Sequence, residues 1–517
     1  MALEKGIYQA FEDVVGQDNI SDDPAILDSY AYRWGPEVED FVQRFAAVLL
    51  PGDTAEVQAI VKLCNKYGIQ FKASSTGWGS MSNPGGPEVV KMDLRRMDRI
   101  IEINEKNMYA VVEPYVISVQ LQAELMKRGL NCNIIGAGGN CSAHPYAAHY
   151  GGGHMGESTS LRERNILAVE WVTPEGEIVK LGSLGSLGEW FCGDGAGPSL
   201  RGITIGHTAP CGGMGVFTKA ATKIYHWAGP PMFPIEGVSP NYVPSEIPPN
   251  FFYRYYSFPS AKELVEAQRK IGESEIAFEV MGFNAAMVAS NMGTSNDEDY
   301  AYFEQFRKLV QGPGFQVILM GNSPEDFEYK KQVLEQIIKE TKGKSLEPLE
   351  DPKVAGALIW RSIRITASIR ECFRAGGAFS AALGGTHPYG EEVAYMEAVS
   401  KLKKDLIKKG ILRDDTGAYL TWPHEHGHLG HAEILIQFRQ TPESIDAIMG
   451  FSEAAMKMAI DNRYGVPHSL SGMIPGMHDV FGPFASNYNV WQRRLKQTFD
   501  PHEVSDPSGY ITGKEAK

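Results

Sequence analysis

Residues 74–84 read Ser-Ser-Thr-Gly-Trp-Gly-Ser-Met-Ser-Asn-Pro, a run of glycine and small hydroxylated residues between two apolar segments. The flanking segments, residues 69–71 and 89–92, have the composition of strands. Glycine lets the backbone turn its NH groups inward, and small side chains let a phosphate approach them. The run therefore predicts an anion-binding loop between two strands, although many plain surface loops have the same composition.

The segments around this loop predict alternating helices and strands. Asp53 and Glu56 can form a capping box for a helix that ends near Gly68. Residues 109–113 are rich in strand formers and stop at Pro114, and residues 118–128 have helical periodicity up to Gly129. The buried face of the first helix is expected to carry Val57, Ile60, Val61 and Cys64.

Two further glycine zones follow, at residues 136–156 and 206–215. Between them, residues 168–173 and 177–181 flank Pro174-Glu175-Gly176, which predicts a hairpin. Residues 216–220 predict a strand directly after the third zone. Three glycine-rich loops that lead into strands indicate one elongated ligand site.

The character of the chain changes after about residue 225. A Pro-rich stretch up to Pro249 predicts a crossover between domains. Beyond it, the pattern predicts an α+β sheet with helices on one face. The expected helices are 262–272, 324–342, 395–409 and one opened by Thr441-Pro442-Glu443, and the expected strands are 276–281, 316–320 and 432–438.

Length and composition limit the function classes. A chain of 517 residues exceeds one hydrophobic core, and its net charge of -14 without a dense basic run argues against nucleic acid and anionic membranes as partners. We expect a cytoplasmic protein, because neither an apolar signal core nor a run of about 18 apolar residues is present. The six cysteines lack a close pair, so an iron-sulfur cluster is not indicated and any further electron relay is expected in another chain.

These pieces, in this order, resemble the vanillyl-alcohol oxidase and p-cresol methylhydroxylase family of FAD flavoproteins, which includes glycolate and D-lactate dehydrogenase subunits. The resemblance rests on the helix after Pro51, the glycine loop, and the Val-Val-Glu-Pro strand end at residues 111–114. It continues through residues 168–177, residues 215–219, and the C-terminal Leu495-Lys496 with Phe499-Asp500-Pro501.

The resemblance implies an α+β fold, with a two-part FAD-binding domain of the p-cresol methylhydroxylase type and a cap domain whose antiparallel sheet is flanked by helices. The implied division is residues 1–229 for FAD binding, 230–464 for the cap, and 465–517 for a segment that returns to the FAD-binding domain. The cofactor is then expected along the three glycine loops, with Val216 and Thr218 contacting it through their backbone. The implied FAD-binding residues are Ser75, Thr76, Gly77, Trp78, Gly79, Ser80, Gly153, Gly156, Gly215, Val216 and Thr218.

Two departures from the family refine this expectation. Some members attach FAD through a His or Tyr, but the first loop has Thr76-Gly77 and the aligned cap segment 375–380 offers no nucleophile. Non-covalent FAD is therefore expected. Phenol-oxidising members carry a Tyr-Arg pair where this chain has Pro467-His468, which disfavours a para-hydroxybenzyl substrate.

The densest chemistry lies in residues 422–433, which hold four of the 13 histidines. If the segment is an extended strand, His424, His426 and His428 share one face. A histidine here can act as the base that removes a hydroxyl proton, or several can bind a divalent metal, or they can only hydrogen-bond inside the cap. Gly427-His428-Leu429-Gly430 fits the start of a family metal motif that later positions break, so a metal stays possible but unassigned. The candidate catalytic residues are His426, His428, His431, Glu433 and His468.

Other candidate groups have ordinary structural explanations. His154 and Glu157 beside the second glycine zone can face a flavin ring or serve the loop's own backbone. Arg361 or Arg364 can pair with a substrate carboxylate, and Cys211 can be a redox thiol or a small buried residue.

Together these features predict an FAD-dependent oxidoreductase that takes a hydride from a small hydroxy acid, alcohol or phenol. The electrons are expected to pass to a separate acceptor or redox partner protein, and the chain is expected to form a homo-oligomer. The rival hypotheses are a metal-dependent lyase or hydrolase centred on residues 424–433, and a non-catalytic flavin-binding assembly subunit.

Overall fold

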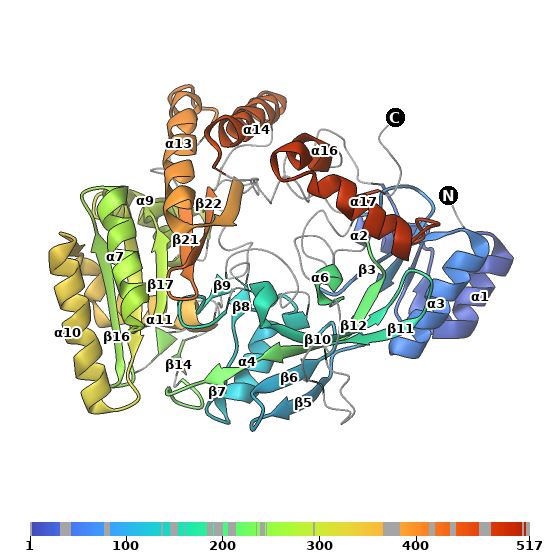
Figure 1. Cartoon of the computed structure of the whole chain (residues 1–517), viewed down its shortest axis with the longest axis horizontal. Helices are drawn as coiled ribbons and strands as arrows, with labels where there is room; N and C mark the ends of the chain where they lie inside the picture. Colours follow the sequence, from blue (N-terminus) through green and yellow to red (C-terminus); the bar gives the residue numbers. More distant parts are fainter. Residues whose placement is uncertain are drawn as a thin grey trace.

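The computed structural model describes residues 3–31, 43–76, 83–135, 138–144, 153–160, 162–182, 190, 200–204, 213–233, 235–237, 243–244, 246–292, 295–364, 383–412, 419–434, 441–464, 477–508 and 511–512. Figure 1 shows the N-terminal elements and the C-terminal helices α16 and α17 together on one side of the molecule, and the elements from β16 to α14 on the other.

The first sheet is small and largely parallel. Its order is β1 (Ile20–Ser21), β2 (Ala47–Leu49), β4 (Val89–Asp93) and β3 (Gln70–Ser74), with β2, β4 and β3 parallel. The helices of this part are α1 (Lys5–Val15), α2 (Pro24–Tyr30) and α3 (Thr54–Tyr67). Because β2, β4 and β3 are parallel, their carboxyl ends meet at one edge, where α/β proteins place ligands.

Helix α3 forms for the reasons predicted. The Asp53 side chain accepts a hydrogen bond from Glu56 N at 2.9 Å, and Gly68 ends the helix with φ 67°. The four predicted apolar positions are buried against the sheet: Val57, Ile60, Val61 and Cys64.

The second sheet is antiparallel and forms the centre of the N-terminal half. Its order is β11 (Ile178–Leu181), β10 (Ile166–Val172), β12 (Val216–Lys223), β6 (Tyr109–Val112) and β5 (Ile100–Asn104). The predicted hairpin around residues 174–176 is confirmed as β10–β11. The remaining described elements are η1 (Gln17–Asn19), α4 (Ser118–Met126), η3 (Arg162–Asn165), α6 (Arg201–Thr204), and the short pairs β7 (Leu130–Asn131) with β13 (Tyr225–His226) and β8 (Ile134–Ile135) with β9 (Gly153–His154).

The other half is built on a seven-stranded antiparallel sheet. Its order is β19 (Lys344–Ser345), β16 (Phe251–Ser257), β18 (Gly314–Met320), β17 (Ala277–Phe283), β21 (Tyr419–His424), β22 (Leu429–Ile434) and β20 (Leu383–His387). Its helices are α7 (Ala261–Ser274), α8 (Ala285–Met292), α9 (Asn296–Phe306), α10 (Pro324–Glu340), α11 (Pro352–Arg364), α13 (Tyr389–Lys408) and α14 (Pro442–Asn462), with η5 (Glu347–Glu350) and the pair β14 (Ile235–Glu236) with β15 (Val243–Pro244).

Helices cover both faces of this sheet, so the expectation of helices on one face is wrong. Val317 packs with Leu264 of α7 and Leu334 of α10, whereas its neighbour Ile318 packs with Ile359 of α11. Successive strand residues point to opposite faces. The sequence analysis did not predict that α11 covers the second face of the sheet. The continuous apolar run of β18, which is buried on both faces, was the signal that could have indicated it.

The C-terminal segment returns to the N-terminal half through α16 (Met477–Phe481), η7 (Gly482–Phe484) and α17 (Tyr488–Phe499). Beyond α17, Phe71 N donates to Val504 O and Asp506 N donates to Phe71 O, each at 2.9 Å. The tail thus lies along β3 like an additional strand. The division at residues 229 and 464 remains a prediction.

Among the described residues, no helix has both the length and the apolar character needed to cross a membrane.

Candidate functional site

The first glycine loop begins at the carboxyl end of β3. Ser75 and Thr76 line a cavity of about 430 Å³ at the edge where the parallel strands end. Ser142 N donates to Thr76 Oγ1 at 3.3 Å, which connects this loop to the second glycine zone. The predicted residues Gly77, Trp78, Gly79 and Ser80 lie outside the described residues.

The same cavity carries hydroxyl groups and a buried cation. Lys91 is 2% exposed, and burial together with the nearby Lys72 lowers its pKa to about 7. Tyr30, Ser74 and Ser75 add hydroxyls to the lining, and Arg95 is paired with Asp93 at 2.6 Å. A bound phosphate would accept hydrogen bonds from these hydroxyls, and its negative charge would favour the protonated form of Lys91. The lining of the cavity therefore fits a phosphate group.

The third glycine zone feeds β12, where Gly215 has φ 81° and its NH donates to Ser505 Oγ at 3.0 Å. Val216 is buried in the core, and Thr218 Oγ1 donates to Glu170 Oε1 at 3.0 Å. Both side chains are therefore engaged inside the protein. Strand β12 pairs with β6 through residues 220–223 only. In the described structure, the backbone of residues 216–219 therefore has no strand partner on the edge of β12 that faces β6.

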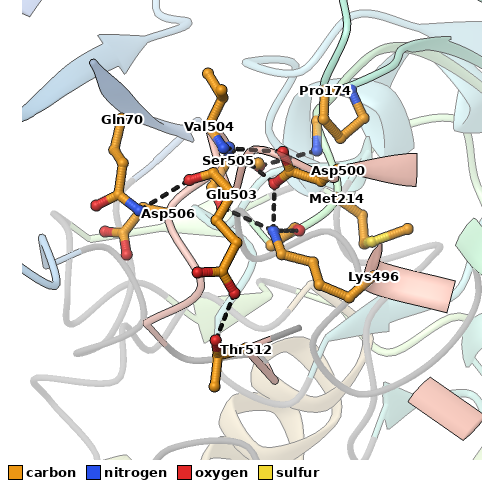
Figure 2. A network of polar contacts seen from close by, with 12 residues as sticks. Gln70, Pro174, Met214, Lys496, Asp500, Glu503, Val504, Ser505, Asp506 and Thr512 are labelled. Atoms are coloured by element: carbon orange, nitrogen blue, oxygen red, sulfur yellow. Dashed lines mark hydrogen bonds and ion pairs between the residues drawn. The ribbon is translucent and has the colours of Figure 1, made fainter. Parts of the chain in front are cut away.

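The C-terminal tail contacts the third glycine zone and the end of the first, since Ser508 Oγ donates to Asn83 O at 3.3 Å. Figure 2 shows the tail's polar contacts around Lys496 and Asp500 and its contact with Gln70. Lys496 is fully buried; its Nζ donates to Gly213 O at 2.6 Å and to Ser505 O at 2.8 Å, and pairs with Asp500. On the other side, Asp506 accepts from Gly85 N at 2.8 Å. The resemblance included Lys496 and Asp500 and expected the tail to return to the FAD-binding domain, but the sequence did not predict their contacts with Gly213 and Ser505.

The histidine segment is a β-hairpin, and the expectation of one extended strand is wrong. Strands β21 and β22 pair from Tyr419–Ile434 to His424–Leu429. Glu425, His426 and Gly427 have φ of 50°, 59° and 77°, so the chain reverses at residues 425–428. Glycine suits this reversal, but two non-glycine residues in the left-handed region are uncommon and gave no signal in the sequence.

The turn separates the predicted histidines. His426 and His428 lie at the tip, with His428 exposed, whereas His424 and His431 are buried on the strands. The tip is attached to the second glycine zone, since Glu425 N donates to Gly156 O at 2.9 Å and His426 N donates to Glu157 O at 3.0 Å. His468 lies outside the described residues.

His431 and Glu433 are brought together, because residues two apart on a strand share a face. His431 Nε2 and Glu433 Oε1 lie 2.8 Å apart. The Trp422 ring lies beside them, 5.7 Å from the His431 ring and 6.1 Å from the His154 ring of β9. This face of the cap sheet thus meets the second glycine zone.

Gly156 lies in tight contact with the cap hairpin. A Cβ atom on this residue would lie 1.9 Å from His424 Nδ1. Position 156 therefore needs a glycine, because His424 of the cap packs directly on its backbone. This requirement holds whether or not the residue also contacts a cofactor. Gly153 lies in β9, paired with Ile135.

Two buried carboxyl groups accompany this contact. Burial raises the pKa of Glu157 to about 8, and burial raises the pKa of Glu279 well above its usual value. Glu279 accepts a hydrogen bond from Met155 N, and both Glu157 oxygens lack a hydrogen-bond partner in the described structure. Burial also lowers the pKa of His154 to about 3, so this imidazole is neutral at neutral pH. The junction offers buried groups able to donate or accept protons.

The candidate arginines of α11 are engaged inside the protein. Helix α11 buries Arg361, and the Arg364 guanidinium donates to Gln122 Oε1 at 2.7 Å. Cys211 lies outside the described residues. Within the described part, no group of three His, Cys, Asp or Glu is arranged to hold a metal ion.

Comparisons with known proteins agree with this geometry. Residues 45–182 match the FAD binding domain family model. The chain is 29% identical over 213 residues to 1'-carboxy-chondrochloren decarboxylase of Chondromyces crocatus, a match that covers 39% of this chain and 37% of that protein. It is 21% identical over 533 residues to a probable mitochondrial D-lactate dehydrogenase of Danio rerio, covering 98% of this chain and 91% of that protein.

Among solved structures, p-cresol methylhydroxylase with substrate bound aligns with a TM-score of 0.76 and 17% identity, covering 100% of this chain and 99% of that one. The predicted resemblance is confirmed: the chain has an FAD-binding domain and the α+β fold of p-cresol methylhydroxylase. Of the proteins named here, the D-lactate dehydrogenase and p-cresol methylhydroxylase are oxidoreductases by name, whereas the protein of Chondromyces crocatus is a decarboxylase.

Proposed function

We propose that this chain removes a hydride from the hydroxyl-bearing carbon of a small hydroxy acid, alcohol or phenol and transfers it to bound FAD. The observation that carries the proposal is the junction at which Trp422, His431 and Glu433 of the cap sheet meet His154 and the second glycine zone. FAD supplies the hydride acceptor, and the protein supplies orientation and proton transfer.

The cofactor is assigned to the three glycine zones. Ser75 and Thr76, with residues 77–80, are proposed to hold its pyrophosphate beside the cavity that contains Lys91. The open backbone edge at Val216 and Thr218 offers NH and carbonyl groups to the cofactor. Gly153, Gly156 and Gly215 are proposed to lie beside the cofactor, although a Cβ at Gly156 or Gly215 would meet His424 or the Val172 carbonyl of the protein itself. FAD is proposed to be held without a covalent bond.

The catalytic base is assigned to the His431–Glu433 pair. A histidine accepts a proton near neutral pH, and a bonded carboxylate orients the ring and stabilises the positive charge that develops. His431 is buried next to Trp422, whereas the Glu433 side chain is partly exposed. His426 and His428 are removed from this role because the hairpin turn carries them to the tip.

Anaerobic mixing of the FAD-loaded protein with a panel of hydroxy acids, alcohols and phenols tests the proposal. We expect at least one class to bleach the flavin, and His431→Ala to slow that bleaching about 100-fold or more. His226→Ala, at an exposed position on β13, is the matched control. An unchanged rate in His431→Ala and Glu433→Gln would remove the base assignment while leaving the redox function intact.

A further inference from the structure

The outer face of the cap sheet carries a cavity that the proposed catalytic junction does not use. Strands β21 and β22 turn Trp422 and His431 toward the second glycine zone. Successive strand residues point to opposite faces, so the paired Thr421 and Ala432 point the other way. Helices α7 and α13 lie side by side on that part of the molecule (Figure 1). A cavity of about 590 Å³ is bounded there by Ala261 at the start of α7, one side of α13, and Thr421.

The lining of this cavity is mainly aliphatic. Helix α13 contributes residues at spacings of three and four between positions 393 and 408, which is one side of the helix over about four turns. Among the described residues of the lining, none is aromatic, so the cavity suits an aliphatic body rather than a stacked ring. Its volume is typical of small-molecule sites. The aliphatic side chains are Ala261, Val310, Pro313, Val393, Met396 and Ile407.

A buried hydroxyl group on the sheet side of the lining has no partner. Thr421 is fully buried, and its Oγ1 has no hydrogen-bond partner in the described structure. Asn284, which directly follows β17, adds an amide group to the same lining. Leaving a buried hydroxyl without a hydrogen bond costs free energy. This position therefore favours a ligand atom that can hydrogen-bond.

The α13 side of the lining is cationic. Lys401, Lys404 and Lys408 line the cavity, against one carboxylate, Glu397, among the described lining residues. Lys408 also pairs with Asp405 at 3.8 Å. All three lysines are exposed, so an anionic head group beside them keeps part of its hydration. In a chain with a net charge of -14, this local excess of positive charge favours an anion.

We propose that this cavity binds an aliphatic carboxylate whose chain also carries a hydroxyl group. The carboxylate lies beside Lys401 and Lys404, the chain contacts the aliphatic lining, and the hydroxyl hydrogen-bonds with Thr421. The site is separate from the proposed catalytic pair, because Thr421 and His431 point to opposite faces of the same sheet. Binding there involves no redox chemistry.

Isothermal titration calorimetry on the FAD-loaded protein tests the proposal with ω-hydroxydodecanoate, dodecanoate and α,ω-dodecanediol, which have the same chain length. Affinity is expected to fall in that order, with the diol weaker than the carboxylates by about 10-fold or more because it lacks the charge. The measurement needs no flavin reduction, so it stands even if the proposed redox function fails. A diol that binds as tightly as the carboxylates, or no binding of either carboxylate at millimolar concentration, would overturn the proposal.

A pair of double variants tests the position of the carboxylate. Lys401→Gln/Lys404→Gln is expected to weaken binding of both carboxylates about 10-fold. Lys308→Gln/Lys409→Gln is the matched control, because it removes the same charge at exposed positions that lie near the lining but outside it. Equal weakening by the two double variants would mean that the head group does not lie beside Lys401 and Lys404, and the proposal would fail.

Two single variants test the interior of the cavity. Thr421→Val is expected to weaken binding of ω-hydroxydodecanoate about 5-fold and to leave dodecanoate unchanged, because only the hydroxylated probe loses a hydrogen bond. Ser400→Trp places a large side chain in the lining and is expected to abolish binding of both carboxylates. Circular dichroism and bound flavin verify that each variant is folded. An undiminished preference for the hydroxylated probe in Thr421→Val, or binding that survives Ser400→Trp, contradicts the proposal.

Discussion

Lys496 Nζ lies 2.6 Å from the carbonyl oxygen of Gly213, so a C-terminal helix directly holds the third glycine zone, 283 residues earlier in the chain. The same ammonium group binds Asp500 and the Ser505 carbonyl. A buried charge is tolerated only when it is paired and hydrogen-bonded. The tail is therefore part of the frame that carries the proposed cofactor site.

Lys496→Met is expected to destabilise the protein by about 3 to 5 kcal/mol, because it leaves Asp500 buried without its partner. It is also expected to weaken FAD binding, since the Gly213 segment loses its anchor. Urea unfolding and FAD titration measure the two effects. Lys457→Met breaks an exposed i,i+4 pair with Asp461 and is expected to cost less than about 1 kcal/mol; equal losses in both variants would contradict the account.

Gly156→Ala is expected to displace the β21–β22 hairpin, because its Cβ would lie 1.9 Å from His424 Nδ1. Overpacking of this kind costs about 1 to 3 kcal/mol. Thermal unfolding and flavin reduction rates measure the effect. Gly86→Ala is the control, since no atom lies within 4 Å of its added Cβ. The double variant Gly156→Ala/His424→Ala should regain stability relative to Gly156→Ala; failure to do so means the histidine is not the obstacle.

The contribution of Glu157 to the stability of the protein should fall as pH rises toward 8, because burial raises the pKa of Glu157 to about 8 in the folded state. The folded state then holds a proton that the unfolded state releases above its ordinary carboxyl pKa, so the contribution is complete at low pH and lost through pH 8. His154 titrates near pH 3 when folded and near 6.5 when unfolded, so its pKa change has no effect above pH 7. The melting temperature of the wild type minus that of Glu157→Gln should decrease from pH 7 to pH 9, because Lys91, whose lowered pKa makes stability rise with pH in this range, contributes equally to both proteins. A difference that does not change with pH, or the same change with the exposed-site control Glu453→Gln, would refute this.

FAD is expected to leave the polypeptide on denaturation. Neither the first glycine loop, which has Thr76-Gly77, nor positions 375–380 contain a His or Tyr that could form a covalent bond to it. Heat or acid precipitation should release all flavin into the supernatant. Flavin that stays with the precipitate and migrates with the chain on a denaturing gel would show a covalent link that the sequence did not reveal.

Much of the N-terminal half followed from the sequence. Asp53, Glu56 and Gly68 fixed α3 through local capping, and Pro174-Glu175-Gly176 fixed a hairpin through turn chemistry. Such signals act within a few residues and can be read from the chain alone. The tail network around Lys496 could not, because it joins segments hundreds of residues apart.

The candidate site was predicted in part. His431 and Glu433 were both named as candidates, but the sequence analysis expected His424, His426 and His428 to share a face and did not predict the His431–Glu433 pair. The turn at residues 425–428 was missed because Glu425 and His426 adopt positive φ values that their residue types do not favour. The tertiary contacts of the tip with Gly156 and Glu157 hold that conformation.

The proposed function depends most directly on anaerobic reduction of the bound flavin, recorded as loss of its visible absorbance against hydroxy acids, alcohols and phenols. The account predicts a yellow, FAD-containing protein that at least one of these classes bleaches, with bleaching slowed about 100-fold or more in His431→Ala. A colourless protein that does not take up FAD, or a yellow one whose flavin no hydroxylated substrate reduces, would contradict it.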